Sequence, residues 1–137
     1  MTIGKGLSKV AAVIGIGESD YVADHARVRA GERPHDSYGY AAIAFNNALK
    51  DAGISRDEID GLIVGPTIAY ERMGELLGIN PTWGSQADAM LAVIEACMAI
   101  QTGMAEVVAL VYGNDQRSAA IQYGGPEAMG GNMFLSY

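Results

Sequence analysis

The chain has 137 residues, which suits one domain with a single hydrophobic core. Half of its residues are hydrophobic, 18% are charged and 18 are glycine, a composition typical of an α/β domain with many tight connections and not of a disordered chain. The formal net charge of −7 argues against nucleic acid as the main partner, because phosphate binding needs a basic face. A single cysteine excludes an internal disulfide, and no apolar run is long enough to span a bilayer, so we expect a soluble cytoplasmic protein.

The first third of the chain predicts a strand, a loop and a helix. Residues 10–16 form a continuous apolar run, as expected for a strand that is buried on both faces. Residues 18–36 are polar and contain both histidines, which indicates a long surface loop. A helix is predicted over residues 38–52, capped by Ser37, because apolar residues recur there at spacings of three and four and Gly53 supplies a left-handed stop.

The rest of the ordered pattern alternates strands and helices. Ser55 and Glu58 have the spacing of a capping box, which predicts one short turn. Strands that alternate with helices predict βαβ units and a mainly parallel sheet. The remaining predicted elements are a strand at 62–64, a helix over 70–77 that Gly78 ends, a short extended piece at 81–83, an alanine-rich helix over 87–102 and a strand at 107–112.

Residues 1–122 therefore predict one α/β unit, and residues 123–137 differ from it. This last segment is rich in glycine and methionine and finishes on an apolar run that contains Phe134 and Leu135. Exposed apolar side chains at the end of a domain invite association. We expect either a flexible tail or a chain that stops partway through a larger fold.

Several stretches, taken in order, resemble the thiolase superfamily. Ala92, Ile100 and Gly103, followed by residues 105–108, reproduce the spacing from the helix behind the family's nucleophilic cysteine to the next strand. The other matching stretches are residues 9–20 (first strand and glycine turn), 48–62 (first helix to second strand) and 114–118, which resembles the lipid-transfer, or sterol-carrier, branch.

The resemblance implies a fold of two similar α/β halves, each with a five-stranded sheet, and two helices sandwiched between the sheets. The resemblance implies that this chain corresponds to the N-terminal half. A helix that is buried on all sides needs small residues at its contacts. The alanines that supply them are Ala87, Ala89, Ala92, Ala96 and Ala99.

The position of the family's nucleophile is occupied by glutamine. Counted back from Gly103, that position is Gln86, whose side chain cannot form an acyl-enzyme thioester. The adjacent Ser85 has no base nearby in sequence, and Ser85 with Asp88 has the spacing of a helix cap, so we expect capping and not nucleophilic attack. The family's general-base histidine and second cysteine belong to the C-terminal half, so the resemblance implies an inactive fragment.

The other chemically capable residues are expected to be structural. Cys97, on the third turn of the alanine-rich helix, is expected to be a small buried hydrophobe, and Glu95 would need a partner if buried. The G-x-G at Gly15 and Gly17 lacks the third glycine of a dinucleotide site. His25 and His35 have no cysteine or acidic residue at the spacing of metal ligands. We therefore expect both histidines at the surface and not in a metal site.

Residues 114–118 are the best candidates for substrate binding. They follow a predicted strand, at the end where open α/β sheets bind ligands. The candidate side chains are Asn114, Arg117 and Ser118, and Arg117 suits a carboxylate or a phosphate.

Two functional hypotheses remain open. In the first, the chain is part of a thiolase-like acyl-CoA enzyme in lipid or steroid metabolism. The resemblance then implies an aldolase-like reaction on a carbon–carbon bond, with acyl-CoA as substrate and no covalently bound cofactor, instead of acyl transfer by classical thiolysis. It also implies a homodimer and an OB-fold, zinc-ribbon partner protein. In the second, the chain is a non-catalytic half-thiolase that serves as a binding or assembly module.

Overall fold

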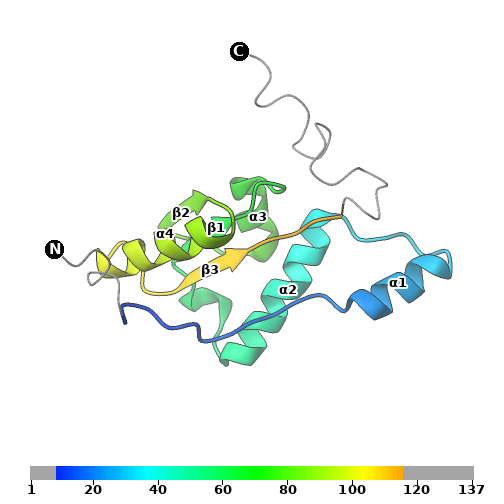
Figure 1. Ribbon diagram of the computed structural model, residues 1–137, viewed down its shortest axis with the longest axis horizontal. Helices are drawn as coiled ribbons and strands as arrows, with labels where there is room; N and C mark the ends of the chain where they lie inside the picture. The colour runs from blue at the N-terminus through cyan, green and yellow to red at the C-terminus, as the bar shows by residue number, and fades with distance from the viewer. Residues whose placement is uncertain (1–8, 116–137) are drawn as a thin grey trace, which may run out of the picture.

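The computed structural model describes residues 9–115, which form a small three-layer α/β unit (Figure 1). The elements are α1 (Tyr21–Arg29), α2 (Ser37–Ala52), a 3-10 turn (Arg56–Glu58), β1 (Gly61–Val64), α3 (Tyr70–Leu77), β2 (Trp83–Gln86), α4 (Ala89–Gln101) and β3 (Val108–Val111). Residues 123–137 lie outside the described range, so the expectation about the C-terminal segment stays a prediction.

The sheet has three parallel strands in the order β2-β1-β3. The predicted parallel α/β architecture is therefore confirmed, whereas a five-stranded sheet is not found among the described residues. Helices cover both faces. α2 and α3 pack on one face around Phe45, Leu62 and Met73, and α4 packs on the other through Ala92 and Ala96 against Ile63.

Strand β1 lies in the centre of the sheet, and its sequence reflects this. Gly61, Leu62, Ile63 and Val64 are all buried, as expected for a short apolar strand that is covered on both faces. The chain then crosses from β1 to β2 on the α3 side and from β2 past β1 to β3 on the α4 side. The two crossovers run in opposite directions along the sheet and lie on opposite faces, so they have the same hand. This agrees with the rule that crossover connections between parallel strands share one hand.

The prediction of a first strand at residues 10–16 is wrong for this structure. The segment is extended, but it pairs with no described strand, and the Val13 and Ile16 side chains are 83% and 75% exposed. It lies against α2 instead. A Cβ atom added at Gly15 would come within 2.5 Å of the Ala48 carbonyl oxygen, and one at Gly17 within 2.2 Å of the Ala44 carbonyl oxygen. The two glycines therefore allow the backbone to touch the helix, which explains the G-x-G without a cofactor.

The prediction of a long loop over residues 18–36 is also wrong in part, because α1 lies within it. Asp20 caps this helix by accepting hydrogen bonds from the backbone N–H groups of Val22 (3.1 Å) and Ala23 (2.9 Å). The negative charge of Asp24 in the first turn and the positive charge of Arg27 in the last turn interact favourably with the helix dipole and stabilise α1. No residue of α1 is buried. The apolar periodicity that identified the other helices is consequently missing here.

Most other boundaries agree with the sequence. The helix predicted at 70–77 is confirmed, and Gly53 and Gly78 end their helices with φ of 69° and 66°. The cap of α2 is Asp36, whose Oδ1 accepts from Gly39 N at 2.8 Å, and not Ser37. β2 lies at 83–86 instead of 81–83, and the predicted 87–102 helix begins two residues later. Within the described part of the chain, no helix is long and apolar enough to cross a membrane.

Asp60 joins the beginnings of the three strands. Its carboxylate accepts hydrogen bonds from the backbone N–H groups of Glu106 (2.9 Å) and Val107 (2.8 Å), just before β3. Its carbonyl oxygen accepts from the N–H groups of Thr82 (2.9 Å) and Trp83 (3.2 Å) at the start of β2. One residue before β1 therefore fixes both neighbouring strands at the amino end of the sheet.

Candidate functional site

The carboxyl ends of the parallel strands bring three loops together at one edge of the sheet. We define the carboxyl-end edge as residues 65–69 after β1, 86–88 at the end of β2 and 112–115 after β3. Open α/β sheets bind their ligands at this kind of edge, as the sequence predicted for residues 114–118.

Side-chain hydrogen bonds connect the first and third of these loops with the start of α2. Thr67 Oγ1 donates to the carbonyl oxygen of Gly113. The buried Ser37 hydroxyl donates to Asp115 Oδ1 at 2.7 Å, and Tyr38 Oη accepts from the backbone N–H of Ala69 at 2.9 Å. A Cβ atom at Gly113 would lie 1.9 Å from the Ser37 carbonyl oxygen, so only glycine fits this contact. The loops at the edge are thus held in fixed positions.

Gln86 and Ser85 point to opposite faces of the sheet. Gln86 is the last residue of β2, and its Nε2 donates to the Ile68 carbonyl oxygen at 3.3 Å on the α3 side. Ser85 follows the α4-facing Trp83 by two residues and therefore shares its face. The predicted cap is wrong: the N-cap residue of α4 is Asp88, without a side-chain cap bond, and Ser85 lies inside the strand.

Tyr70, the first residue of α3, lies next to the carboxyl-end edge, and sequence reasoning missed it. Its ring lies against Gly84, where a Cβ atom would come within 2.2 Å of the phenol oxygen. Burial raises the pKa of Tyr70 above its ordinary value, and the neighbouring Glu71 carboxylate adds to the rise. The Tyr70 phenol therefore keeps its proton to a higher pH than an ordinary tyrosine does. The glycine in the middle of a short strand was the available signal, because it marks a close approach.

Of the three predicted substrate-binding residues, the structure describes one. Asn114 is half-buried, and its Nδ2 donates to the Tyr112 hydroxyl at 3.1 Å. The Tyr112 ring packs over Gly65, at a distance that leaves no room for a Cβ atom there. Arg117 and Ser118 lie outside the described residues, so their part in the site stays a prediction.

The other chemically capable residues do not form a site. Cys97 is half-buried and therefore less buried than the small buried hydrophobe that the sequence predicted. Glu95 has one buried carboxylate oxygen without a hydrogen-bond partner among the described residues. His25 is exposed, and His35 lies beside Arg27 (3.2 Å) and the Tyr40 ring. Within residues 9–115 no group of three His, Cys, Asp or Glu residues could hold a metal ion.

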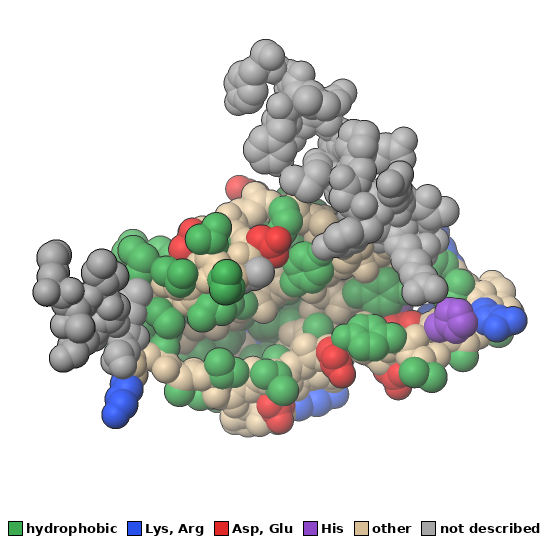
Figure 2. Space-filling model, viewed as in Figure 1, with side chains coloured by type: hydrophobic (Ala, Val, Ile, Leu, Met, Phe, Trp, Pro, Cys, Tyr) green, Lys and Arg blue, Asp and Glu red, His purple; other side chains and the backbone are tan. Residues whose placement is uncertain are grey.

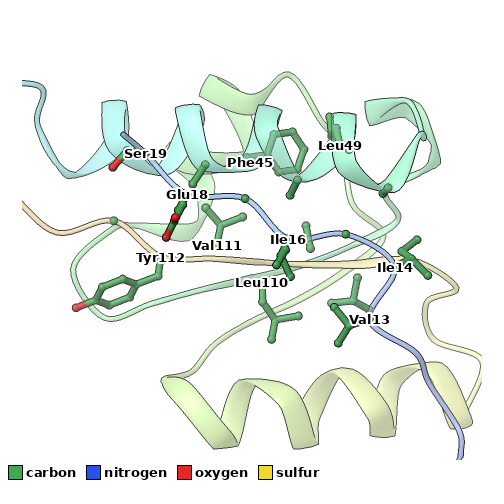
Figure 3. A pocket seen from close by; sticks show the side chains of 18 of the residues that line it. Val13, Ile14, Ile16, Glu18, Ser19, Phe45, Leu49, Leu110, Val111 and Tyr112 are labelled. Atoms are coloured by element: carbon green, nitrogen blue, oxygen red, sulfur yellow. The ribbon is translucent and has the colours of Figure 1, made fainter. Parts of the chain in front are cut away.

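A groove of about 1550 Å³ runs along β3, between this strand and residues 11–19 (Figure 3). Its floor and walls are mostly apolar. Val13, Ile14 and Ile16 line it from the first segment, Phe45 and Leu49 from α2, and Leu110 from β3. α4 closes the other face with Val93, Ala96, Cys97 and Ile100. Figure 2 shows hydrophobic side chains on both sides of this groove.

Comparison with known proteins shows that the chain is similar to a CoA lyase and to an aldolase. No protein-family model matches the chain. Over 120 residues it is 32% identical to the 17-hydroxy-3-oxo-4-pregnene-20-carboxyl-CoA lyase of Mycobacterium tuberculosis, an alignment that covers 82% of this chain and 29% of the lyase. The structure is similar to that of an Ltp2-ChsH2(DUF35) aldolase, with a TM-score of 0.65, 25% identity, and coverage of 85% of this chain and 31% of the aldolase chain. The chain therefore spans less than a third of the length of either relative.

Proposed function

We propose that the chain forms part of a thiolase-like, lipid-transfer-branch aldolase that breaks or forms the carbon–carbon bond of a β-hydroxyacyl-CoA with a lipid or steroid acyl group. The observation that carries the proposal is the alignment with the M. tuberculosis lyase over 82% of this chain. The presence of Gln86 where the resemblance places a thiolase cysteine supports it from the chemical side.

The name of the lyase substrate defines the chemistry. A hydroxyl on carbon 17 next to carbon 20, which carries the carboxyl-CoA, is a β-hydroxy thioester. In cleavage, a base removes the hydroxyl proton and the new carbonyl forms as the bond between the two carbons breaks. The electron pair of that bond passes to the thioester as an enolate, which then takes up a proton. The thioester stays intact, so no acyl-enzyme forms and no nucleophilic cysteine is needed.

The residues of this chain would then position the substrate and not attack it. The Tyr70 phenol, which lies against Gly84, and the Gln86 amide would serve as hydrogen-bond donors to a developing enolate oxygen. The described edge loops, 65–69, 86–88 and 112–115, contain no lysine or arginine. We therefore assign the phosphate groups of CoA to Arg117 and Ser118 or to another part of the enzyme.

A partner protein is part of this proposal. The similar aldolase structure carries a DUF35 protein in its name, which supports an association of this chain with a protein of that type. The resemblance to the thiolase superfamily also implies a homodimer, in which this α/β unit would contact the α/β unit of a second copy.

The test mixes the full 137-residue chain with the part of the M. tuberculosis lyase outside the aligned region. A β-hydroxyacyl-CoA with a ring-carbon hydroxyl is added, and the products are separated by mass spectrometry. We expect a ketone and a shortened acyl-CoA, without release of free CoA. Gln86→Ala should lower the rate by about ten- to a hundredfold and leave the product ratio unchanged.

Two outcomes would contradict the aldolase proposal. A stable acyl adduct on Ser85 or Cys97, or free CoA as the main product, would indicate acyl transfer. An assembled complex that leaves the substrate intact would instead favour the non-catalytic module. That second candidate has one observation of its own, the row of exposed apolar side chains on α4 that includes Met90, Leu91 and Val93.

A further inference from the structure

The peptide group between Ile68 and Ala69 links two side chains at the carboxyl-end edge. Its carbonyl oxygen accepts a hydrogen bond from Gln86 Nε2 at 3.3 Å, and its N–H donates to Tyr38 Oη at 2.9 Å. The peptide group is trans and planar, so its C=O and N–H point in opposite directions and can only turn together. The Tyr38 hydroxyl therefore fixes the direction of the carbonyl oxygen that Gln86 contacts.

Tyr38 is itself held in place. It lies in the first turn of α2, and its ring packs against the main core cluster. The preceding residue, Ser37, is buried and bonds to Asp115, which ties the start of the helix to the edge. A phenylalanine would fill the same space in the core. The hydroxyl therefore supplies the bond to Ala69 and not the packing.

Gln86 has less support of its own. Its side chain is exposed, and the bond to Ile68 is the one hydrogen bond that its amide group makes within residues 9–115. An exposed glutamine loses rotamer freedom when it is held in one orientation, so this orientation depends on the acceptor. Because a carbonyl oxygen only accepts, the NH2 end of the amide must face Ile68. One N–H of that group is then left for a ligand.

We propose that Tyr38 is a positioning residue for Gln86: through the peptide group between Ile68 and Ala69, it holds the Gln86 amide so that the second N–H donates to an oxygen of the substrate. The role of Gln86 toward the substrate rests on the proposed function. The fitting group is the thioester oxygen, which gains negative charge as the carbon–carbon bond breaks and then binds an N–H donor more strongly. Tyr38 does not touch the substrate in this arrangement.

The two hydrogen bonds of the peptide group also strengthen each other. A donor on the carbonyl oxygen polarises the group and makes its N–H a better donor, and an acceptor on the N–H makes the oxygen a better acceptor. Loss of the Tyr38 hydroxyl therefore weakens the Gln86 bond and also allows the peptide group to turn.

A purely structural role for Tyr38 is the alternative. Ala69 is the N-cap residue of α3, which has no side-chain cap bond, so the hydroxyl would only satisfy an N–H at the start of this helix. In that case removal of the hydroxyl leaves the Gln86 side chain unchanged. The two roles therefore differ in the response of Gln86.

Nuclear magnetic resonance of the full chain measures this response without any enzyme activity. The variant is Tyr38→Phe, and the control is Tyr40→Phe on the same helix, whose ring centroid lies 5.6 Å from that of His35. Tyr38→Phe should speed exchange of the Ala69 amide about tenfold and move the side-chain NH2 signals of Gln86, whereas Tyr40→Phe should change neither. Faster exchange at Ala69 with unmoved Gln86 signals would overturn the proposal.

Gln86→Ala tests the same connection from its other end. Gln86 is exposed, so this variant should fold, which circular dichroism and the fluorescence of the single tryptophan report. Without the Gln86 donor the peptide group is less polarised, so the Ala69 amide should exchange about two- to fivefold faster. An Ala69 amide that exchanges at its original rate would contradict the link between the two side chains.

The kinetics of the assembled complex provide the third arm. The chain is combined with the part of the M. tuberculosis lyase outside the aligned region, called here the lyase section. Tyr38→Phe should lower kcat about three- to tenfold with little change in KM, because Gln86 acts on charge that develops in the transition state. In the Gln86→Ala background it should have no further effect. Equal losses in both backgrounds would contradict positioning through Gln86.

Loss of the positioning and loss of the reaction give different results. A complex without lyase activity refutes the proposed function, but the Gln86 signals in Tyr38→Phe still decide whether Tyr38 positions this side chain. An active complex that responds to Gln86→Ala and not to Tyr38→Phe refutes the positioning and leaves the proposed function intact.

Discussion

At the scale of single residues, the absence of a side chain at Gly17 decides where the first segment lies. A Cβ atom at this position would meet the Ala44 carbonyl oxygen and the Ala48 backbone nitrogen at 2.2 and 2.3 Å. We expect Gly17→Ala to lower the free energy of unfolding by about 1–3 kcal/mol, as in other overpacked sites. Urea unfolding measures the loss. Exchange of the Ile16 amide should become faster as its bond to Asp51 breaks.

Gly74→Ala is the matched control. Gly74 is buried in α3, but an added Cβ atom would meet its nearest neighbour, the Ile79 carbonyl oxygen, at an ordinary 3.9 Å. Alanine also favours helix over glycine. This variant should be as stable as the original chain or more so. Equal stability of Gly17→Ala would show that the first segment does not need its contact with α2.

Tyr70 predicts a pH dependence with a definite sign. Its pKa is raised in the folded chain, first by burial and then by Glu71, so the folded state holds the phenol proton to higher pH than the unfolded state. The corresponding stability is fully present below the ordinary tyrosine pKa of about 10 and is lost as pH rises through the higher folded-state pKa. Tyr70→Phe should therefore reduce the fall in urea midpoint above about pH 10. Identical slopes in the two proteins would contradict this assignment.

At the scale of elements, Asp60 determines how the strands begin. Its carboxylate binds the N–H groups of Glu106 and Val107, and no other described carboxylate bridges two strands in this way. Asp60→Ala should destabilise the fold by about 2–3 kcal/mol, because bonds to a charged acceptor are lost and the two N–H groups lose their partner. Asp57→Ala removes the same charge from an exposed residue whose side chain makes no hydrogen bond within residues 9–115, and it is the control. Similar urea midpoints for both variants would show that the loss of stability comes from the change in net charge and not from the hydrogen bonds of Asp60.

The sequence predicts those elements whose signals are local. α2, α3 and α4 carry apolar residues at helical spacing, and Gly53 and Gly78 mark their ends, so these helices could be found without a structure. Residues 10–16 have an apolar run that is typical of a strand, but strand formation needs a neighbour that the described chain does not provide. α1 buries none of its residues, so only the Asp20 cap and the charges of its turns could reveal it.

The candidate site was predictable to a similar degree. The end of a buried strand predicted that Asn114 lies at this edge, because parallel strands place their carboxyl ends at one edge, and its role in substrate binding stays a prediction. Tyr70 and Ser37 escaped prediction, since both reach the edge through long-range contacts, with Gly84 and with Asp115. No local pattern encodes contacts between residues so far apart along the chain.

At the scale of the whole molecule, the covering of the sheet is uneven. On one face α2 and α3 pack over the main cluster, and on the other α4 contacts the strands mainly through alanines. The outer side of α4 carries Met90 and Leu91, which are 80% and 63% exposed, with Ile94 and Met98 also exposed. A helix that is apolar on both sides is typical of a buried element. The resemblance to a fold with sandwiched helices offers a reason for this surface.

The exposed side of α4 predicts that the isolated chain associates. Contiguous apolar surface of this kind drives self-association or binding to a partner. We expect sedimentation velocity to show species larger than the monomer as concentration rises, and the double variant Leu91→Lys with Ile94→Lys to shift them toward monomer. Both side chains are exposed, so the variant should keep its circular dichroism spectrum.

Leu76→Lys separates the effect of the surface from that of added charge. Leu76 is also exposed, at 46%, but it lies on α3, away from the α4 surface. One added lysine there should leave association almost unchanged if α4 carries the contact. If Leu76→Lys dissociates the chain as well as the α4 variant does, a lysine at any exposed position is sufficient and the α4 surface is not the interface. If the lyase section binds and also abolishes self-association, both contacts use the same apolar face of the unit.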